Sequence, residues 1–178
     1  MEFFLISINP IDVFLWTFRK NERDVVNLYN TMSPVMQIAT GGSMLNFGYW
    51  SSEHLDPISA QENLCNIFGN LSELSTAKTV LDVGSGLSAP SKLWRDSYPD
   101  LNLYDVNINF KQLSFLKDTK NIEFLNSTST KLPFMDNSVD RVLALESAQH
   151  FKPLEDFISE SKRVLMKSGF LIMAVPIT

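Results

Sequence analysis

The stretch from Thr79 to Pro90, TVLDVGSGLSAP, decides the fold of this chain. Its first residues are β-branched or aliphatic and predict a short strand, which the glycines at 84 and 86 then break. Ser88 is expected to cap a following helix, with Pro90 in its first turn. Glycine lets a ligand approach the backbone closely, and the free N–H groups of the next helix face that ligand. The stretch therefore predicts a strand, a ligand-binding turn and a helix.

Two nucleotide cofactors compete for this turn. Gly84, Gly86 and Ala89 fit the dinucleotide pattern GxGxxG/A, and Asp105 lies at the right distance downstream to hold a ribose diol. Asp82 lies two residues before the first glycine, where a carboxylate would repel a pyrophosphate but attract ammonium and sulfonium groups. The turn therefore favours S-adenosylmethionine over NAD. The alternative reading is an ordinary glycine turn between a strand and a helix.

Composition sets the broad class of the protein. The chain has 178 residues, of which 44% are hydrophobic and 20% charged, as expected for one globular domain. The net charge of −5 provides no basic field for a phosphate backbone, so nucleic acid is not an expected partner. Cys65 is the one cysteine and can form no intrachain disulfide, and two histidines without a cysteine pair give no zinc spacing. We expect a cytoplasmic protein without a metal.

The first 20 residues, MEFFLISINPIDVFLWTFRK, form an apolar and aromatic segment. Glu2, Pro10 and Asp12 interrupt it, and its basic residues follow the apolar run instead of preceding it. These features fit neither a signal peptide nor a membrane-spanning helix. We expect the segment to pack on the domain, and weak contact with a membrane surface is the alternative.

The remaining chain alternates helical and strand patterns. Helices are expected over 21–40, with Asn21 as N-cap and a bend or end at Pro34, and from Asp56 to about Ser75. After the glycine turn, strands are expected at 101–107, 121–126, 138–147 and 169–178. Helices are expected at 88–97, from Phe110 to Leu116, and from Leu154 to a close at Gly169. The pattern predicts an α/β fold, a Rossmann-like parallel sheet of about five strands with flanking helices. The expected layout is an apolar segment at 1–20, a helical cap at 21–75 and a sheet domain at 76–178.

In such sheets, ligands bind beyond the carboxyl ends of the strands. This rule brings together Asp82 to Gly86, Asp105, the segment 126–129 and the segment 146–150. Upstream, Tyr49 and Trp50 place two large aromatic side chains on a glycine-containing loop. They could close over a small-molecule pocket, or they could pack on the next helix.

Four motifs carry a resemblance to a known family: VLDVGSG, LYDVNI, LPFMDNSVDRVLALESAQHF and RVLMKSGF. From about Leu28 to the last residue, the chain resembles class I S-adenosylmethionine-dependent methyltransferases of the small-molecule type, methyltransferase type 11 among them. LNFGYW and ESAQHF are similar to segments of members that methylate natural products, sugars, quinones or sterol-like lipids. The family fold usually continues past the fifth strand with a helix and two more strands. On this resemblance the chain is expected to be short at its C-terminus.

The resemblance implies roles for individual residues on the cofactor side. Asp82, Gly84, Ser85 and Gly86 would hold the methionine end. Asp105 would accept both ribose hydroxyls, because a carboxylate has two acceptor oxygens, and Val106 would pack on the adenine. Thr128 and Ser129 stand where the family often has an aspartate that contacts the adenine amine, and Glu146 would orient the methionine end. Ser88 stands in place of the third glycine of the family motif. Asp105 could alternatively be a helix cap or a turn acid.

The resemblance also implies where the methyl acceptor lies. Since the cofactor supplies an activated methyl group, catalysis needs positioning and, for an oxygen or nitrogen acceptor, removal of a proton. His150 is the candidate base because imidazole titrates near neutral pH. Gln149, Tyr49 and Trp50 are the candidate acceptor contacts.

We therefore expect transfer of a methyl group to an O, N or C atom of a small molecule. An inactive or truncated S-adenosylmethionine-binding remnant is the main alternative, and an NAD-binding oxidoreductase is the other. Because the fifth strand would have an unpaired edge, self-association is also expected.

Overall fold

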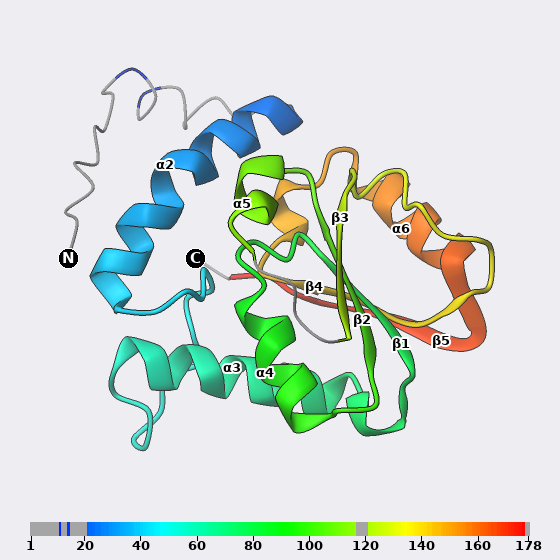
Figure 1. Cartoon of the computed structure of the whole chain (residues 1–178), viewed down its shortest axis with the longest axis horizontal. Coiled ribbons are helices and arrows are strands. Elements are labelled where there is room, and N and C mark those ends of the chain that lie inside the picture. The colour runs from blue at the N-terminus through cyan, green and yellow to red at the C-terminus, as the bar shows by residue number, and fades with distance from the viewer. Residues whose placement is uncertain (1–10, 12–13, 15–20, 117–120, 177–178) are drawn as a thin grey trace.

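The computed structural model describes residues 11, 14, 21–116 and 121–176. It contains a five-stranded parallel sheet with helices on both faces, as the sequence predicts (Figure 1). The strand order is β3-β2-β1-β4-β5, so the chain starts in the middle of the sheet and builds outward to each edge. The strands are β1 (Thr79–Val83), β2 (Asn102–Asn107), β3 (Ile122–Asn126), β4 (Val139–Leu145) and β5 (Leu165–Ala174). The predicted Rossmann-like fold is confirmed.

The helices connect these strands and cover their two faces. They are α2 (Glu22–Thr40), α3 (Pro57–Leu71), α4 (Ala89–Ser97), α5 (Phe110–Ser114) and α6 (Leu154–Val164), with short 3-10 turns η2 (Leu74–Thr76) and η3 (Ala148–His150). Two clusters of buried hydrophobic side chains lie on the two faces of the sheet. One joins α3 and α4 to β1, β2 and β4, and the other joins α6 to β1 and β4. The central strands β1 and β4 are therefore buried along almost their whole length, because both of their faces are covered.

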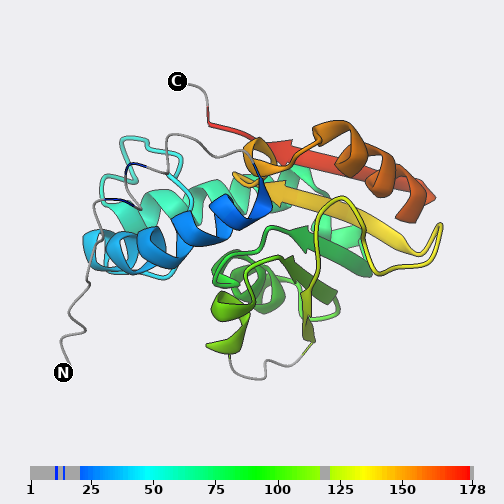
Figure 2. The same cartoon turned by 90° about the horizontal axis from the view of Figure 1, so that it is seen from above.

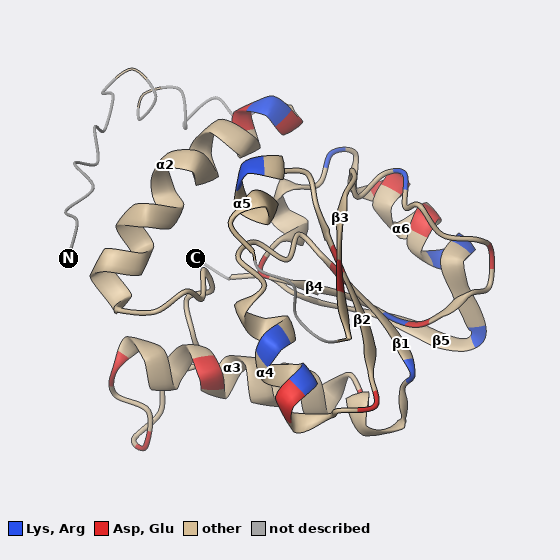
Figure 3. Ribbon diagram, in the orientation of Figure 1, with Lys and Arg blue, Asp and Glu red and all other residues tan. Residues whose placement is uncertain are grey.

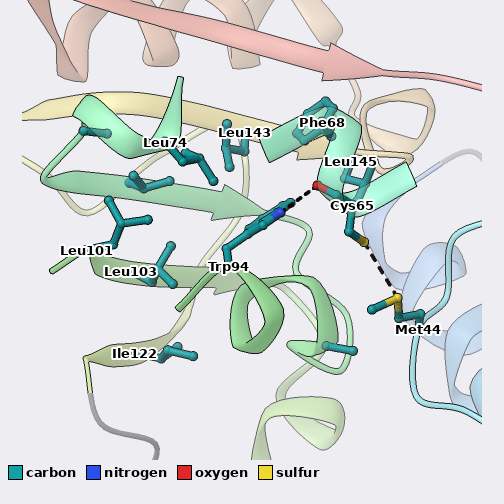
Figure 4. Close-up of a cluster of buried hydrophobic side chains, with 13 residues drawn as sticks. Met44, Cys65, Phe68, Leu74, Trp94, Leu101, Leu103, Ile122, Leu143 and Leu145 are labelled. Atoms are coloured by element: carbon teal, nitrogen blue, oxygen red, sulfur yellow. Dashed lines mark hydrogen bonds between the residues drawn. The ribbon is translucent and has the colours of Figure 1, made fainter. Parts of the chain in front are cut away.

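The cluster on the α3 and α4 face is centred on Trp94, which is 1% exposed (Figure 4). Its ring stacks on Phe68 at 6.1 Å between centroids, and its Nε1–H donates to the Cys65 carbonyl at 2.9 Å. The Cys65 thiol lies against the Met44 sulfur at 3.7 Å, and burial raises the pKa of that thiol to about 12. Cys65 is therefore a core residue and not a nucleophile.

The N-terminal helix α2 lies beyond the carboxyl ends of the strands, toward which the arrowheads point in Figure 2. Its start is fixed by a capping box at the predicted N-cap: Asp24 N–H donates to the Asn21 side chain at 3.2 Å, and Asn21 N–H donates to the Asp24 carboxylate at 3.3 Å. The charges of α2 are confined to its first turn, Glu22 to Asp24, and the rest of the helix is uncharged (Figure 3). This uncharged helix faces the strand ends.

Helix α2 continues through Pro34 to Thr40, so of the two alternatives for this proline, a bend or an end, the end is wrong. Two other details differ from the sequence-based expectation. Gly169 does not close the last helix. That helix ends at Val164, and Gly169 lies within β5, where a Cβ would approach the Asp140 carbonyl oxygen at 2.7 Å. Ser88 does not cap α4 with its side chain, because its hydroxyl points to Asp105 instead.

Of the first 20 residues, only Ile11 and Phe14 belong to the described part, so the packing expected of that segment lies outside it. None of the described helices is long and apolar enough to span a bilayer. At one edge of the sheet, β5 pairs with β4, and no other described strand pairs with β5. The division of the chain at residues 20 and 75 stays a prediction.

Candidate functional site

A cavity opens where β1, β2 and β4 end, under α2. Its wall combines the glycine turn after β1, Val106 and Asn107 at the end of β2, Glu146 and His150 after β4, and Tyr29 of α2. It encloses about 970 Å³, counted out to its open mouth. The predicted site residues on its wall are Asp82, Gly84, Ser85, Gly86, Val106, Ser129, Glu146 and His150.

The glycine turn brings backbone to the floor of this cavity. Gly84 and Gly86 have φ of +81° and +57°, which side chains rarely tolerate. A Cβ on Gly84 would lie 2.5 Å from the Ser147 Cβ, so the turn packs directly against the segment after β4. Between the two glycines, the buried Ser85 hydroxyl has no hydrogen-bond partner among the described residues. A buried hydroxyl without a partner is costly, and a bound ligand could supply one.

Two carboxylates lie side by side under the turn. Asp82 and Asp105 are register partners on β1 and β2 and are 2% and 0% exposed. The Ser91 hydroxyl bridges them, at 3.1 Å from Asp82 Oδ2 and 2.6 Å from Asp105 Oδ1, and Ser88 Oγ donates to Asp105 Oδ2. Burial raises the pKa of Asp105 to about 6, against the effect of both hydroxyls. Burial and the charge of Asp105 raise the pKa of Asp82 well above its usual range.

Asp105 does not lie on the cavity wall, where the ribose-binding hypothesis needs it. Its side chain points to the α4 face of the sheet, and both carboxylate oxygens accept hydrogen bonds from serines. Asn107, two residues on, takes the strand-end position on the wall. Its Nδ2 donates to the Gly86 carbonyl at 3.0 Å, and its Oδ1 accepts from Asn109 N–H at 2.9 Å. Asn107 therefore ties the end of β2 to the glycine turn.

The sequence reasoning missed Asn107 and Tyr29. For Asn107, the signal was the alignment of the two strands. Asp82 lies two residues before Gly84, and Asp105 lies two residues before Asn107. The two acids therefore pair in register, and Asn107 is the residue at the end of β2. For Tyr29, periodicity identified an apolar face of the helix but not the contact across 121 residues that puts it in the site.

His150 and Tyr29 form a pair on the wall. The Tyr29 hydroxyl lies 2.9 Å from His150 Nε2, and the two rings meet edge to face at 5.4 Å between centroids. The His150 N–H donates to the Ser147 carbonyl at 3.0 Å, which fixes η3 at the end of β4. The backbone of His150 is thus fixed by the 3-10 turn, and its imidazole contacts Tyr29 of α2.

Glu146 connects the cavity to the loop before α3. It has a left-handed backbone conformation (φ 49°), and its Oε2 accepts from Phe47 N–H at 2.7 Å. Burial raises the pKa of its carboxyl. Because the loop residues Ser43, Leu45 and Asn46 also line the cavity, this hydrogen bond holds one side of the wall in place.

The other predicted contacts lie off the wall. Tyr49 and Trp50 are 56% and 53% exposed, and Trp50 Nε1–H donates to the Phe47 carbonyl at 3.0 Å. The Gln149 side chain donates to the Glu146 carbonyl at 2.6 Å. Thr128 donates to Glu22 at the start of α2. None of these four predicted residues faces the cavity in the described structure, although each lies within a short distance along the chain of a residue that does.

Comparison with known proteins connects this site to one family. Residues 81–173 match the profile of a family described as a methyltransferase domain. The chain is 26% identical over 164 residues to the erythromycin 3''-O-methyltransferase of Saccharopolyspora erythraea, covering 88% of this chain and 54% of that protein. It is 27% identical over 161 residues to the methyltransferase GfsG of Streptomyces halstedii, covering 85% of this chain and 57% of that protein.

Among solved structures, the [4+2]-cyclase SpnF superposes with a TM-score of 0.79 at 21% identity, over 86% of this chain and 60% of that one. At this identity the superposition shows a shared fold. The chain spans about half the length of the curated relatives it matches.

Proposed function

Since the chain belongs to the methyltransferase domain family through residues 81–173, we propose that it binds S-adenosylmethionine in the cavity under α2 and serves methyl transfer to a hydroxyl of a small molecule. The observation that carries the proposal is the meeting of the glycine turn and the His150–Tyr29 pair on one cavity wall. These segments are far apart in the sequence. A glycine turn with a purely structural role would not explain why His150 and Tyr29 lie beside it.

The cavity residues suit this cofactor in three ways. The backbone of Gly84 and Gly86 can approach it without a Cβ in between. The Ser85 hydroxyl can gain the partner it otherwise lacks. Asp82 on the wall offers a carboxyl group to a cationic methionine end, whereas the pyrophosphate of NAD would meet that same carboxyl unfavourably. When bound, the cofactor supplies an activated methyl group.

His150 is proposed as the base that takes the proton of the acceptor hydroxyl. Tyr29 lies at hydrogen-bond distance from Nε2 of the imidazole, and both residues line the cavity together with the glycine turn. Proton removal by a positioned imidazole contributes about 10²-fold to 10⁴-fold in rate. An oxygen acceptor is favoured because His150 offers a candidate base on the cavity wall and because the Saccharopolyspora erythraea relative is an O-methyltransferase.

Three further expectations accompany this proposal. We expect the protein to act in the cytoplasm, since its one cysteine is buried and gives no sign of an oxidising compartment. Weak membrane contact would involve residues 1–20, which lie almost entirely outside the described part. Self-association would involve the free side of β5, whose neighbour in the sheet is β4 alone among the described strands.

The test is calorimetric titration of the chain with S-adenosylmethionine, S-adenosylhomocysteine and NAD. We expect binding of the first two and none of NAD. Gly86→Val, which places side-chain atoms in the cavity next to Leu45, should abolish binding while its circular dichroism stays that of the parent chain. His150→Gln should bind normally.

Turnover is measured separately with a panel of polyketide, sugar and phenol acceptors. Methylation of one of them is the expected result. Tight binding without turnover on any acceptor would favour a binding-only protein, and loss of both adenosyl ligands would remove the proposal.

A further inference from the structure

The buried pair Asp82 and Asp105 poses a hydrogen-counting problem. Ser91 Oγ lies within hydrogen-bond distance of both carboxyl groups but carries a single hydrogen. The shorter contact, 2.6 Å, goes to Asp105, and the Ser88 hydroxyl donates to the other oxygen of that carboxylate. If both acids were ionised, Asp82 Oδ2 would face the Ser91 oxygen at 3.1 Å with no hydrogen between them.

One additional proton solves this problem. With a proton on Asp82, its O–H donates to Ser91 Oγ, the Ser91 O–H donates to Asp105 Oδ1, and Ser88 donates to Asp105 Oδ2. Each of the three oxygen–oxygen contacts, Asp82–Ser91, Ser91–Asp105 and Ser88–Asp105, then contains one hydrogen. We infer that Asp82 and Asp105 share one proton through Ser91 in the free protein, and that binding of the cationic cofactor beside Asp82 releases this proton to the solvent.

The surroundings of the pair agree with this assignment. Asp105 carries the negative charge because two hydroxyls donate to it and Lys92 of α4 lies near it. Asp82 is desolvated, faces that charge and has one weak hydroxyl contact, so its pKa lies the higher of the two. On the α3 side, Cys65 faces Asp82 as a neutral thiol. The other titratable side chains on the cavity wall are Glu22, Tyr29, Glu146, His150 and Lys152.

The pair gives Asp105 and Ser91 a positioning role in place of the ribose contact predicted from sequence. Asp82 is the member on the cavity wall, and Asp105 behind it sets its protonation. A neutral Asp82 lowers the cost of an empty site, because only one buried charge has to be solvated by the two serines. A cation entering the cavity favours the ionised form of Asp82, so binding and proton release are linked.

Isosteric variants separate the two acids. In Asp105→Asn, the amide N–H₂ can donate to Ser91 Oγ, whose hydrogen then goes to an ionised Asp82, so the network is complete without the shared proton. In Asp82→Asn, the same argument leaves Asp105 ionised and removes the acid beside the glycine turn, while Glu22 and Glu146 stay on the wall. Asp156→Asn, on the exposed surface of α6, makes the same chemical change away from the site and is the matched control.

The first measurement needs no cofactor. The carboxyl carbons of Asp82 and Asp105, assigned by NMR with the two variants, are titrated in the free protein. We expect the pair to retain one proton at pH 7 and Asp82 in Asp105→Asn to have lost it. Two carboxyls that are both ionised at pH 7 would overturn the proton-sharing.

The second measurement counts protons on binding and rests on the proposed function, since it requires S-adenosylmethionine to bind. Calorimetry in buffers of different ionisation enthalpy should show about one more proton released by the parent chain and by Asp156→Asn than by Asp105→Asn. Between pH 5.5 and 7.5, the affinity of the parent chain and of Asp156→Asn for S-adenosylmethionine should rise with pH. Per pH unit, this rise should exceed that of Asp105→Asn by a factor of about ten. Equal proton release in all three would overturn the linkage. Absence of binding to any of them would instead count against the proposed function, and the titration of the free protein would still decide the proton-sharing.

Discussion

At the scale of single residues, the pairing of His150 with Tyr29 makes a prediction about catalysis. His150→Ala should leave the affinity for S-adenosylmethionine within about twofold and lower turnover by about 10²-fold or more, because the acceptor proton then has no positioned base. Tyr29→Phe removes the hydroxyl that lies 2.9 Å from Nε2 and keeps the aromatic ring, so we expect a smaller loss and a shifted pH optimum. Steady-state kinetics and binding titrations on both variants measure this. Full activity of His150→Ala would point to another base or to an acceptor that needs none.

The buried acids make a second prediction at this scale, about stability. The folded-state pKa of Asp105 is raised from 3.8 to about 6, so its contribution to stability is complete below pH 4 and is lost as pH rises through 6. One pKa unit corresponds to about 1.4 kcal/mol, and the shift is therefore worth at most about 3 kcal/mol. Relative to the parent chain, Asp105→Asn should become more stable on going from pH 4 to pH 8, by about 2–3 kcal/mol or more, because the variant removes the raised pKa of Asp105 and also relieves Asp82 of the neighbouring charge.

Urea unfolding of the parent and Asp105→Asn at several pH values tests this difference, with Asp156→Asn as control. The free energy of unfolding of the control should follow the parent at every pH. A constant difference between the parent and Asp105→Asn would mean that Asp105 has an ordinary pKa in the folded protein.

Residue chemistry alone predicted part of the site. The glycine turn and Asp82 could be read from local sequence because a strand, a turn and a helix are set by neighbours in the chain. Asp105 was expected at the ligand-binding edge because its strand pattern ends nearby, but it is level with Asp82, and Asn107 is the residue at the end of β2. The residue at which a strand ends depends on its pairing with neighbouring strands, which a local pattern does not specify. Tyr49 and Trp50 were placed on a loop correctly, but the course of that loop is fixed by tertiary contacts such as Tyr49 N–H to the Ala60 carbonyl at 2.8 Å.

At the scale of elements, the alternating patterns predicted the strands to within a few residues, with the largest error between α6 and β5. The helix ends at Val164 and the strand begins at Leu165, with no turn residue in between. Gly169 looked like a helix end, yet its position in β5 is explained by the close approach of Asp140. Sequence patterns cannot distinguish these two uses of glycine, because both need the absence of a Cβ.

The strand–turn–helix element of β1 and α4 makes the third prediction. Gly84→Ala adds a Cβ 2.5 Å from the Ser147 Cβ at a residue with φ of +81°. The strained backbone and the overpacking together should lower the free energy of unfolding by about 2–4 kcal/mol. In Gly42→Ala, the matched control, the new Cβ meets only Ile58 at 3.5 Å, and the change in stability should stay within about 1 kcal/mol. Chemical denaturation measures both, and equal effects would show that the turn tolerates a side chain.

At the scale of the whole molecule, the cavity lies between helix α2, from the N-terminal third of the chain, and the sheet formed by later residues. Helix α2 reaches the sheet through side chains that are distant in sequence, such as Ser33 with Gln112 at 2.8 Å and Tyr29 with His150. Beyond its charged first turn, the helix carries no charged side chains, which suits it to cover a ligand site (Figure 3). The helix itself was predictable from its capping box and periodicity. Its place over the strand ends was not, because no local signal specifies a partner that far along the chain.

The outer edge of β5 makes the last prediction, about association. Strand β5 pairs with β4 alone among the described strands, and its side chains Met166 and Met173 are 37% and 40% exposed. An edge with free N–H and C=O groups beside apolar side chains is a template for pairing with another strand. We therefore expect this 178-residue chain to associate with itself at micromolar concentration. Sedimentation velocity over a range of concentrations measures this.

A charge at that edge should weaken the association, since lysine on an edge strand opposes pairing and costs little stability where it reaches solvent. Met173→Lys should shift the distribution toward monomer by about tenfold in the dissociation constant. Met135→Lys makes the same change at a residue that is 80% exposed in the loop between β3 and β4, and it should sediment as the parent chain does. If both variants behave alike, another surface carries the association. If the parent chain stays monomeric and its β5 amides resist hydrogen exchange, the edge is covered within one chain, which leaves residues 1–20 as the segment to test next by deletion.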